Sequence, residues 1–371
     1  MKKATHVQDD EGVRISQASS QTNGAGLAGD QLLTSLAVDA VIAGLASEPL
    51  LPPQPVSMAI SPADVFARGK RMLQEGQYGD ALSLFDDLIA RSANESHLFN
   101  ARGHAHVLLL DFDQGIADFT TAIELRPTYA PAYNNRGYAY LCKEEYARAI
   151  EDFERAIELQ PTLAMGFANR GVAKAAQGGL DSAIADFDEA LRLNPDLPNV
   201  YQNRGVALLA SGEFDQARRD FDEALRRRPE MASAYFNRAF LYVSQSQAEQ
   251  ALCDLGEAIR LKPDMAEAYF LRGDVLRSQG DPVGASAEYG RALVLRADFF
   301  LALLHRAECH LACGNNRAAV SDLTTLIDHG VYLGAAYRCR SQAYLALGDA
   351  DAADRDQEQA SCLASAAMNK S

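Results

Sequence analysis

Four asparagines recur at intervals of 34 residues, at Asn135, Asn169, Asn203 and Asn237. Each side-chain amide offers an acceptor and two donors, so a stacked row of them could pair with both polar groups of an extended peptide backbone. Such a row would bind a polypeptide through its main chain rather than its side chains. The alternative is that asparagine is simply tolerated on a solvated face, or persists from the duplication of one unit.

A second group of side chains could bind a soft metal ion. His305, Cys309 and Cys313 follow one another at intervals of four residues, which would align them along one helix. No complete ligand set accompanies them, and the period of 34 puts residue 309 in register with alanines such as Ala105, so packing is the simpler interpretation. The sequence also lacks a glycine-rich phosphate loop, a Gly-x-Ser-x-Gly motif and a zinc-protease helix. We therefore predict no cofactor, no metal and no catalytic site.

The elements that position these residues are copies of one unit. Prolines 34 residues apart define a register in which nine units fill residues 62–367 without an insertion. Positions 8 and 20 of the unit are small throughout, and position 24 is large and mostly aromatic until Gln357 in the last unit. This periodicity is typical of a repeat architecture rather than of one globular core. The prolines are Pro127, Pro161, Pro195, Pro229 and Pro263.

Each unit is expected to fold as two antiparallel helices. In the third unit, apolar residues recur at helical spacing in two runs, which the polar stretch 143–145 separates. Pro161 ends the second run because proline cannot continue a helix. Small residues at positions 8 and 20 allow the helices to approach, and the large residue at position 24 fills the space beside them. The predicted fold is therefore all-α, an α-α superhelix, with units at 62–95, 96–129, 130–163, 164–197, 198–231, 232–265, 266–299, 300–333 and 334–367.

The pattern resembles the tetratricopeptide repeat over about four-fifths of the chain. It has the mostly aromatic position 4, the small positions 8 and 20, the aromatic position 24 and the proline at position 32. One departure is arginine at position 7, where the family normally has leucine. An acid stands at position 23 in the last eight units, so we expect a bidentate bridge between the two helices rather than an anion-binding row of arginines. The arginines are Arg68, Arg102, Arg136, Arg170, Arg204, Arg238, Arg272, Arg306 and Arg340, and the acids are Asp118, Asp152, Asp186, Asp220, Asp254, Glu288, Asp322 and Asp356.

The resemblance implies that the first helix of each unit lines a concave groove, which positions 2, 5, 6, 9, 12 and 13 face. The four asparagines occupy position 6 of units 3 to 6, similar to the asparagine ladder that holds extended polypeptide in the repeat domain of O-GlcNAc transferases. The Lys/Asn/Asn/Lys/Arg clamp of chaperone-tail adaptors is absent, so an adaptor of that kind is disfavoured. Beside the asparagines, the same register places the apolar residues Tyr138, Val172, Val206, Phe236, Phe240 and Phe270.

Composition restricts the partner and the compartment. The formal net charge of −15 disfavours nucleic acid and anionic membranes. The one basic cluster, residues 218–219 and 226–228, alternates with acids, and we interpret it as a solvated face rather than a phosphate site. The six cysteines have no disulfide-framework spacing, which is typical of a reducing compartment and favours a cytoplasmic protein.

Residues 1–61 differ from the repeats. Residues 4–30 are rich in Ser, Gln, Asp, Gly and Thr, which predicts disorder. Residues 30–46 could form an amphipathic helix, and the prolines that follow predict an extended linker. Acidic residues before this segment and Asp39 within it disfavour a secretory signal, and the segment is too short for a membrane span. It could cover the open face of the first unit or rest in the groove, while the polar ninth unit could serve as its own cap ahead of residues 368–371.

Together these features predict a non-catalytic protein–protein interaction scaffold, which binds an extended, partly apolar polypeptide segment in the groove of units 3 to 6. Two alternatives stay open. The chain could be the substrate-recognition component of a glycosyltransferase-type assembly, or a chaperone or effector of a secretion system, which the Ser- and Gln-rich start would support. The oligomeric state is not indicated by any pattern in the sequence.

Overall fold

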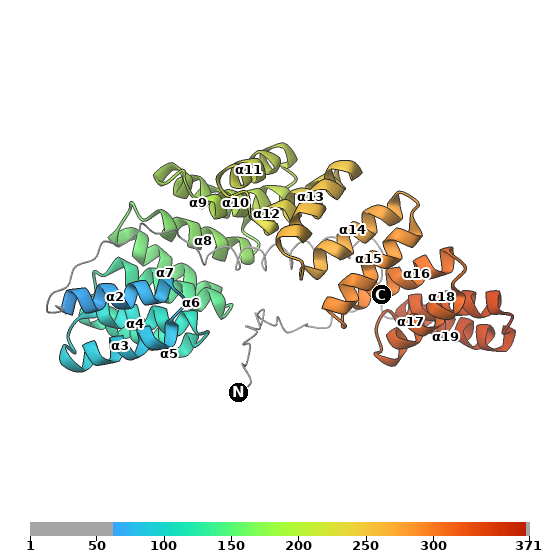
Figure 1. Cartoon of the computed structure of the whole chain (residues 1–371), viewed down its shortest axis with the longest axis horizontal. Helices are drawn as coiled ribbons and strands as arrows, with labels where there is room; N and C mark the ends of the chain where they lie inside the picture. The colour runs from blue at the N-terminus through green and yellow to red at the C-terminus, as the bar shows by residue number, and fades with distance from the viewer. Residues whose placement is uncertain (1–61, 369–371) are drawn as a thin grey trace, which may run out of the picture.

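The computed structural model describes residues 62–368, which form a succession of paired α-helices wound into an arc (Figure 1). The first helices of the nine units are α2 (Pro62–Gln74), α4 (Ser96–Leu108), α6 (Ala130–Cys142), α8 (Ala164–Ala176), α10 (Pro198–Ala210), α12 (Ala232–Ser244), α14 (Ala266–Ser278), α16 (Phe300–Ala312) and α18 (Leu333–Leu347). The second helices are α3 (Tyr78–Arg91), α5 (Phe112–Leu125), α7 (Tyr146–Leu159), α9 (Leu180–Leu193), α11 (Phe214–Arg227), α13 (Ala248–Leu261), α15 (Pro282–Leu295), α17 (Asn316–Asp328) and α19 (Ala350–Met368). The predicted disordered tail, amphipathic helix 30–46 and linker lie outside the described residues.

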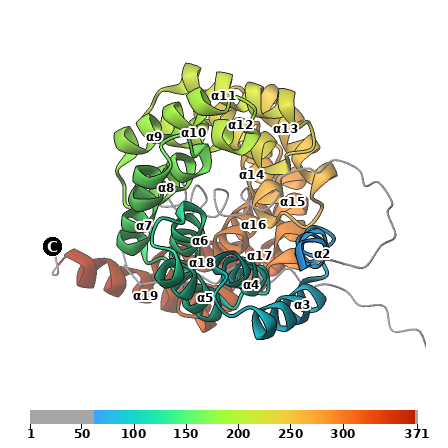
Figure 2. The same ribbon diagram turned by 90° about the vertical axis from the view of Figure 1, so that its left-hand side faces the viewer.

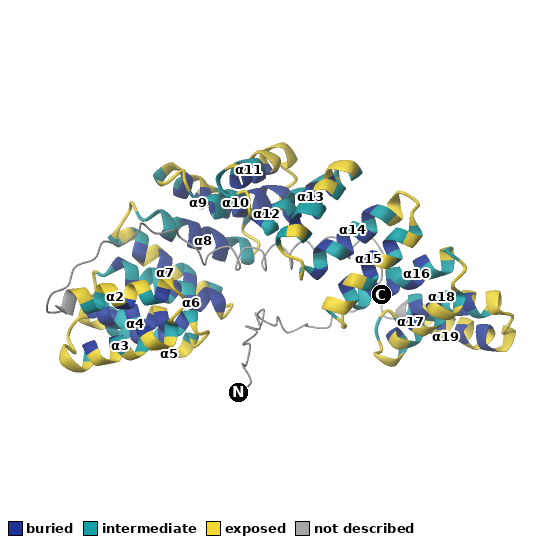
Figure 3. Ribbon diagram, viewed as in Figure 1, coloured by how far each residue is buried: buried dark blue, intermediate teal, exposed yellow. Residues whose placement is uncertain are grey.

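The helices form two layers. Figure 2 looks along the superhelix, and there the first helices, such as α8, α10 and α12, lie toward the central axis while α9, α11 and α13 lie outside. Buried residues concentrate between the layers, and exposed residues concentrate on the outer helices and turns (Figure 3). The predicted all-α superhelix is thus confirmed for residues 62–368. None of the helices in this range is both long and apolar enough to cross a membrane.

The closest packing inside a unit joins positions 8 and 24. A Cβ atom added to Gly137 would lie 2.8 Å from Cε1 of Phe153, and one added to Gly171 would lie 2.8 Å from Cε1 of Phe187. Both phenylalanine rings are fully buried. Glycine is therefore required here so that the two helices can approach over the ring, and the packing expected from the sequence is confirmed.

The predicted arginine–acid bridges are present in the last eight units. In seven of them Nε and Nη2 of the arginine donate to the two different carboxylate oxygens at 2.6–2.9 Å, while Arg272 places both nitrogens on one oxygen of Glu288. The acids are buried and the arginines largely so. Because desolvation offsets much of the attraction, these pairs fix the helix register more than they add net stability.

The same arginines also reach the preceding unit. Nη1 of Arg204 donates to Asp188 at 2.5 Å, and Nη1 of Arg238 donates to Asp222 at 2.6 Å. These acids occupy position 25 of the preceding unit. In the units that precede Arg136 and Arg340, position 25 is a threonine, and the arginine donates to its hydroxyl instead. One guanidinium thus joins three helices. Position 25 is glycine ahead of Arg272 and Arg306, at Gly256 and Gly290.

The turn between the two helices of a unit has one fixed conformation. Position 15 has a positive φ in every one of the nine units, and six of these residues are glycine. The other three are Leu110, Glu144 and Ser246, with φ values of 62°, 60° and 59°. A residue with a Cβ is destabilised in this left-handed conformation by about 1–2 kcal/mol. The packing of the two helices must therefore offset this cost at these three residues.

The ninth unit ends the array with a polar surface. Gln357 is exposed on α19, whereas the equivalent rings, such as Phe153, are fully buried. This exposure is what the hypothesis of a self-capping last unit requires.

Candidate functional site

The four predicted asparagines lie on four successive inner helices, α6, α8, α10 and α12. Asn135 is half-buried, but the side chains of the other three are almost completely removed from solvent. Asn169 is 3% exposed, Asn203 is 2% exposed and Asn237 is 6% exposed. This burial argues against the view that asparagine is merely tolerated on a solvated face.

The first part of the row is satisfied within the protein. Nδ2 of Asn135 donates to Oδ1 of Asn100 at 3.0 Å, and Oδ1 of Asn135 accepts from Asn134 at 3.4 Å. Nδ2 of Asn169 donates to Oδ1 of Asn134 at 3.2 Å. Asn100 and Asn134 were not among the predicted site residues. In the sequence they could have been recognised as asparagines at position 5 of their units, one residue before position 6, which the row occupies.

Further along the row, four amide atoms have no hydrogen-bond partner among residues 62–368. Oδ1 of Asn169, both Oδ1 and Nδ2 of Asn203, and Nδ2 of Asn237 are buried without a hydrogen bond among the described residues. Leaving a buried polar group unpaired costs about 1–3 kcal/mol, and folded proteins rarely contain several such groups together. The unpaired atoms include both donors and acceptors. A ligand that pairs with all of them must therefore carry both hydrogen-bond acceptors and hydrogen-bond donors.

The predicted apolar residues divide into two sets. Tyr138 and Phe240 are half-buried on the inner helices and remain partly accessible. Val172, Val206, Phe236 and Phe270 are buried among neighbouring helices. Phe270 packs against Phe299 with ring centroids 4.7 Å apart. The predicted residues therefore contribute mostly a packed apolar wall rather than freely projecting side chains.

One pocket lies beside the end of the row, between α12, α14 and the segment that follows α15. Phe236 and Phe240 line it from α12, and Phe270 and Leu271 line it from α14. The remaining lining residues are Glu267, Arg296 and Phe299. Nearly all of this lining is aromatic or aliphatic carbon.

Comparison with protein-family models agrees with this architecture. A model described as "Tetratricopeptide repeat" matches residues 130–163, and a second model of that description matches 203–252 and 240–300. A model described as "TPR repeat" matches residues 175–212. The chain is a tetratricopeptide-repeat protein. Proteins of this family serve generally as protein-interaction scaffolds.

Solved structures show the same repeat fold. The chain has a TM-score of 0.60 and 16% identity to a structure titled "Crystal structure of APC/C hetero-tetramer Cut9-Hcn1", covering 69% of this chain and 50% of that one. It therefore spans about half the length of that protein. A tetratricopeptide repeat protein from Parabacteroides merdae gives a TM-score of 0.52 and 16% identity. The alignment covers 67% of this chain and 98% of that one. PilW, a type IV pilus biogenesis factor, gives a TM-score of 0.51 and 19% identity, over 54% of this chain and 92% of that one. No curated protein matches the sequence.

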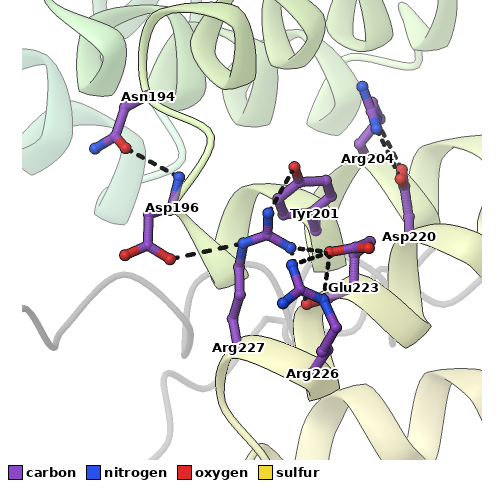
Figure 4. A network of polar contacts seen from close by, with 8 residues as sticks. All are labelled: Asn194, Asp196, Tyr201, Arg204, Asp220, Glu223, Arg226 and Arg227. Atoms are coloured by element: carbon purple, nitrogen blue, oxygen red, sulfur yellow. Dashed lines mark hydrogen bonds and ion pairs between the residues drawn. The ribbon is translucent and has the colours of Figure 1, made fainter.

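Three arginines of the basic cluster, Arg218, Arg226 and Arg227, form ion pairs with acids of the same repeat region. Figure 4 shows Arg226 and Arg227 converging on Glu223. Arg227 also donates to the hydroxyl of Tyr201 at 3.2 Å and lies 4.3 Å from the centre of its ring, and its Nε lies 3.6 Å from Asp196. With both guanidinium groups engaged, the interpretation as surface rather than phosphate site is supported.

The candidate metal ligands of the repeat array do not converge. Nδ1 of His305 lies 2.9 Å from Oδ1 of Asp274, which also accepts from the hydroxyl of Tyr289 at 2.6 Å. Cys309 is buried, and this burial raises the pKa of its thiol to about 11, so the sulfur stays protonated near neutral pH. Among residues 62–368 no group of three or more His, Cys, Asp or Glu side chains could hold a metal ion.

Proposed function

We propose that the inner face of α6, α8, α10 and α12 binds an extended, uncharged protein segment through its main chain. The observation that carries this proposal is the set of unpaired atoms on Asn169, Asn203 and Asn237, which are buried in the free chain and pair with the ligand once these amides turn toward the inner face. A bound anion would satisfy only the amide nitrogens, and a cation only the oxygens. A peptide backbone presents N–H and C=O groups alternately, so it can satisfy both.

The charge of this face supports an uncharged ligand. In units 3 to 6, positions 2, 5, 6, 9, 12 and 13 contain no Asp, Glu, Lys or Arg, although 23% of the whole chain is charged. A strongly charged segment would lose hydration here without gaining a counter-ion. We therefore expect the bound stretch to be rich in small polar and apolar residues.

The strength of the interaction is limited. Four hydrogen-bonding sites at about 1 kcal/mol net each give about 4 kcal/mol, which corresponds to millimolar binding. Burying two apolar side chains of the ligand at about 1.5–3 kcal/mol each would bring the dissociation constant toward the micromolar range. Ordering of the extended ligand opposes these gains.

The proposal is tested with peptides selected from a random twelve-residue library displayed on phage. The selected peptides are titrated calorimetrically into the wild-type chain and into the Asn203→Ala variant, which loses both unpaired groups. We expect this change to weaken binding by about thirtyfold, since it removes two hydrogen bonds of about 1 kcal/mol each.

Asn135→Ala is the matched control, because the Asn135 amide is already paired with Asn100 and Asn134. It should weaken binding by less than about threefold. Replacing all four asparagines of the row should give the largest loss while the helical circular dichroism signal is kept. The proposal fails if no peptide is selected, or if the selected peptides bind Asn203→Ala as tightly as the wild-type chain.

A further inference from the structure

One stretch of the inner face is covered more completely than the repeat pattern explains. Position 13 of the unit lies at the end of each inner helix, and the alanines at this position, Ala210, Ala312 and Ala346, are exposed. Cys142 occupies the same position in the third unit, has a larger side chain and is only 9% exposed. The helices that surround Cys142 recur around Ala210 and Ala312, so helix packing alone does not account for the difference.

Position 9 shows the same contrast. His104 in the second unit is exposed, whereas Val172 and Val206 in the fourth and fifth units are 2% and 8% exposed. Gln202, at position 5 of the fifth unit, is fully buried although it is polar. The covered stretch thus extends over α6, α8 and α10, which pack side by side and lie toward the central axis (Figure 2).

The occupant of this stretch should be uncharged and apolar. Positions 2, 5, 6, 9, 12 and 13 of units 3 to 5 contain no Asp, Glu, Lys or Arg, so a charged occupant would lose hydration without gaining a counter-ion. Residues 31–46 of the same chain match this requirement, because most of them are leucine, alanine or valine and Asp39 is their one charged residue. This segment lies outside the described residues.

The segment is close enough along the chain to reach the covered stretch. Residues 47–61 connect it to Pro62, the first residue of α2. These fifteen residues would span up to about 46 Å if each extended by 3.1 Å. Packed helices lie about 8–10 Å apart, so α10, the fourth inner helix after α2, is within about 40 Å of it along the array. The tether therefore reaches α6, α8 and α10.

We infer that residues 31–46 lie over this stretch in the free protein and keep the asparagine row closed until a ligand displaces them. The inference rests on the proposed function and adds its regulation. In the amphipathic helix that the pattern of residues 31–46 predicts, main-chain groups pair with one another, so the segment covers Asn169 and Asn203 without pairing with their amides. An extended ligand can pair with them, while the tether gives the segment a high local concentration. Binding is thus a competition between a tethered, weak occupant and a free ligand that gains hydrogen bonds.

Cys142 reports the cover without any ligand. Burial raises the pKa of its thiol to about 11, and the thiolate is the form that alkylating reagents attack. The full-length chain and its variants are treated with iodoacetamide, and modification at each cysteine is measured by mass spectrometry. Cys309, which is 1% exposed between packed helices, reports opening of the fold itself.

The test variant combines Leu36→Asp with Val41→Asp, which places two charges on the apolar side of the predicted helix, where the uncharged inner face should reject them. We expect Cys142 to react at least about tenfold faster than in the wild-type chain, and the library-selected peptides to bind at least about fivefold more tightly. Thr22→Asp with Leu27→Asp is the matched control, because it adds the same charge at the same spacing outside the segment. It should change neither quantity, and Cys309 should react slowly in both variants.

The outcomes separate the cover from the ligand site. If Cys142 reacts no faster in the test variant than in the control, or if Cys309 accelerates with it, the inference is overturned whether or not peptides bind. If Cys142 accelerates but peptide affinity is unchanged, the segment does not compete with the ligand, and the regulation is overturned while the proposed function stands. If no peptide is selected from the library, the proposed function fails, whereas a faster reaction of Cys142 still supports the cover.

Discussion

A Cβ atom built on Gly290 would lie 3.8 Å from Nη1 of Arg306. In the units around Arg204 and Arg238, the corresponding nitrogen contacts an aspartate of the preceding unit. The junction between the seventh and eighth units therefore has the arginine of an inter-unit bridge but lacks the acid.

Gly290→Asp should supply that acid. We expect the variant to exceed Gly290→Asn in free energy of unfolding by about 0.5 kcal/mol, the usual value of a partly exposed ion pair. Asparagine is the control because its helix propensity is close to that of aspartate while it carries no charge. Urea unfolding measures the difference, which should vanish when Arg306 is also replaced by leucine. Equal stability of the Asp and Asn variants with Arg306 intact would contradict the bridge.

Leu110→Gly should stabilise the second unit. Leu110 has φ 62° and is 61% exposed, so glycine relieves the left-handed backbone and removes little packing. The expected gain is about 0.5–1 kcal/mol, since the greater freedom of glycine in the unfolded chain offsets part of the relief. Leu109→Gly is the control, because residue 109 has φ −91°. A rise in thermal midpoint for both variants alike would show that side-chain exposure, not the turn, is responsible.

Asn203→Leu should raise stability while it abolishes ligand binding. Leucine has a similar size and removes two buried groups that lack partners, which is worth about 1–3 kcal/mol for each group relieved. Asn135→Leu should do the opposite, because it breaks hydrogen bonds to Asn100 and Asn134. Guanidinium unfolding of the two variants decides the matter. A loss of stability in Asn203→Leu would mean that Asn203 has a structural role.

Arg204→Leu should destabilise the chain by up to about 3 kcal/mol near neutral pH, because the Asp220 carboxylate would lose its partner while buried. Arg68→Leu should cost much less, since Arg68 is exposed and faces Leu84 at position 23. Melting temperatures of the two variants give the comparison. Equal shifts would contradict a bridging role for Arg204.

The Arg204→Leu variant should also have a characteristic pH dependence. Burial already raises the pKa of Asp220, and Arg204 opposes that rise. Without the arginine, the folded-state pKa moves further above the unfolded value of about 3.9, so the folded chain binds the proton more tightly. The destabilisation should therefore be small at pH 4 and should grow as pH rises through the folded-state pKa. A deficit that is constant between pH 4 and pH 8 would show that Asp220 is not the cause.

Contacts inside one unit could be predicted from the sequence because they join fixed positions. Gly137 meets Phe153 and Arg136 meets Asp152 at a separation of 16 residues, which the pairing of two helices determines. Once the period was known, both contacts followed from the residue types. The left-handed turn could be predicted from the sequence where it contains Gly178. It could not be predicted where it contains Glu144, because glutamate does not favour a positive φ.

Contacts between units could not be predicted in this way. The distance from Nη1 of Arg204 to Asp188 depends on how far one unit rotates against the next, and no single unit contains that information. For the same reason the sequence identified the asparagine row but not the pairing of Asn135 with Asn100.

The bridging arginines have a consequence for how such an array could change its length. Six of these guanidinium groups, including that of Arg204, lie near an acid 16 residues ahead and a polar group 16 residues behind, so an extra residue between them would separate the partners. Excision of a whole period is different. Loss of residues 164–197 would bring Arg204 opposite Glu154, the residue that now lies 3.9 Å from Arg170. Genetic gain or loss of complete 34-residue blocks therefore preserves the ionic connections, whereas smaller insertions in the helices should be selected against.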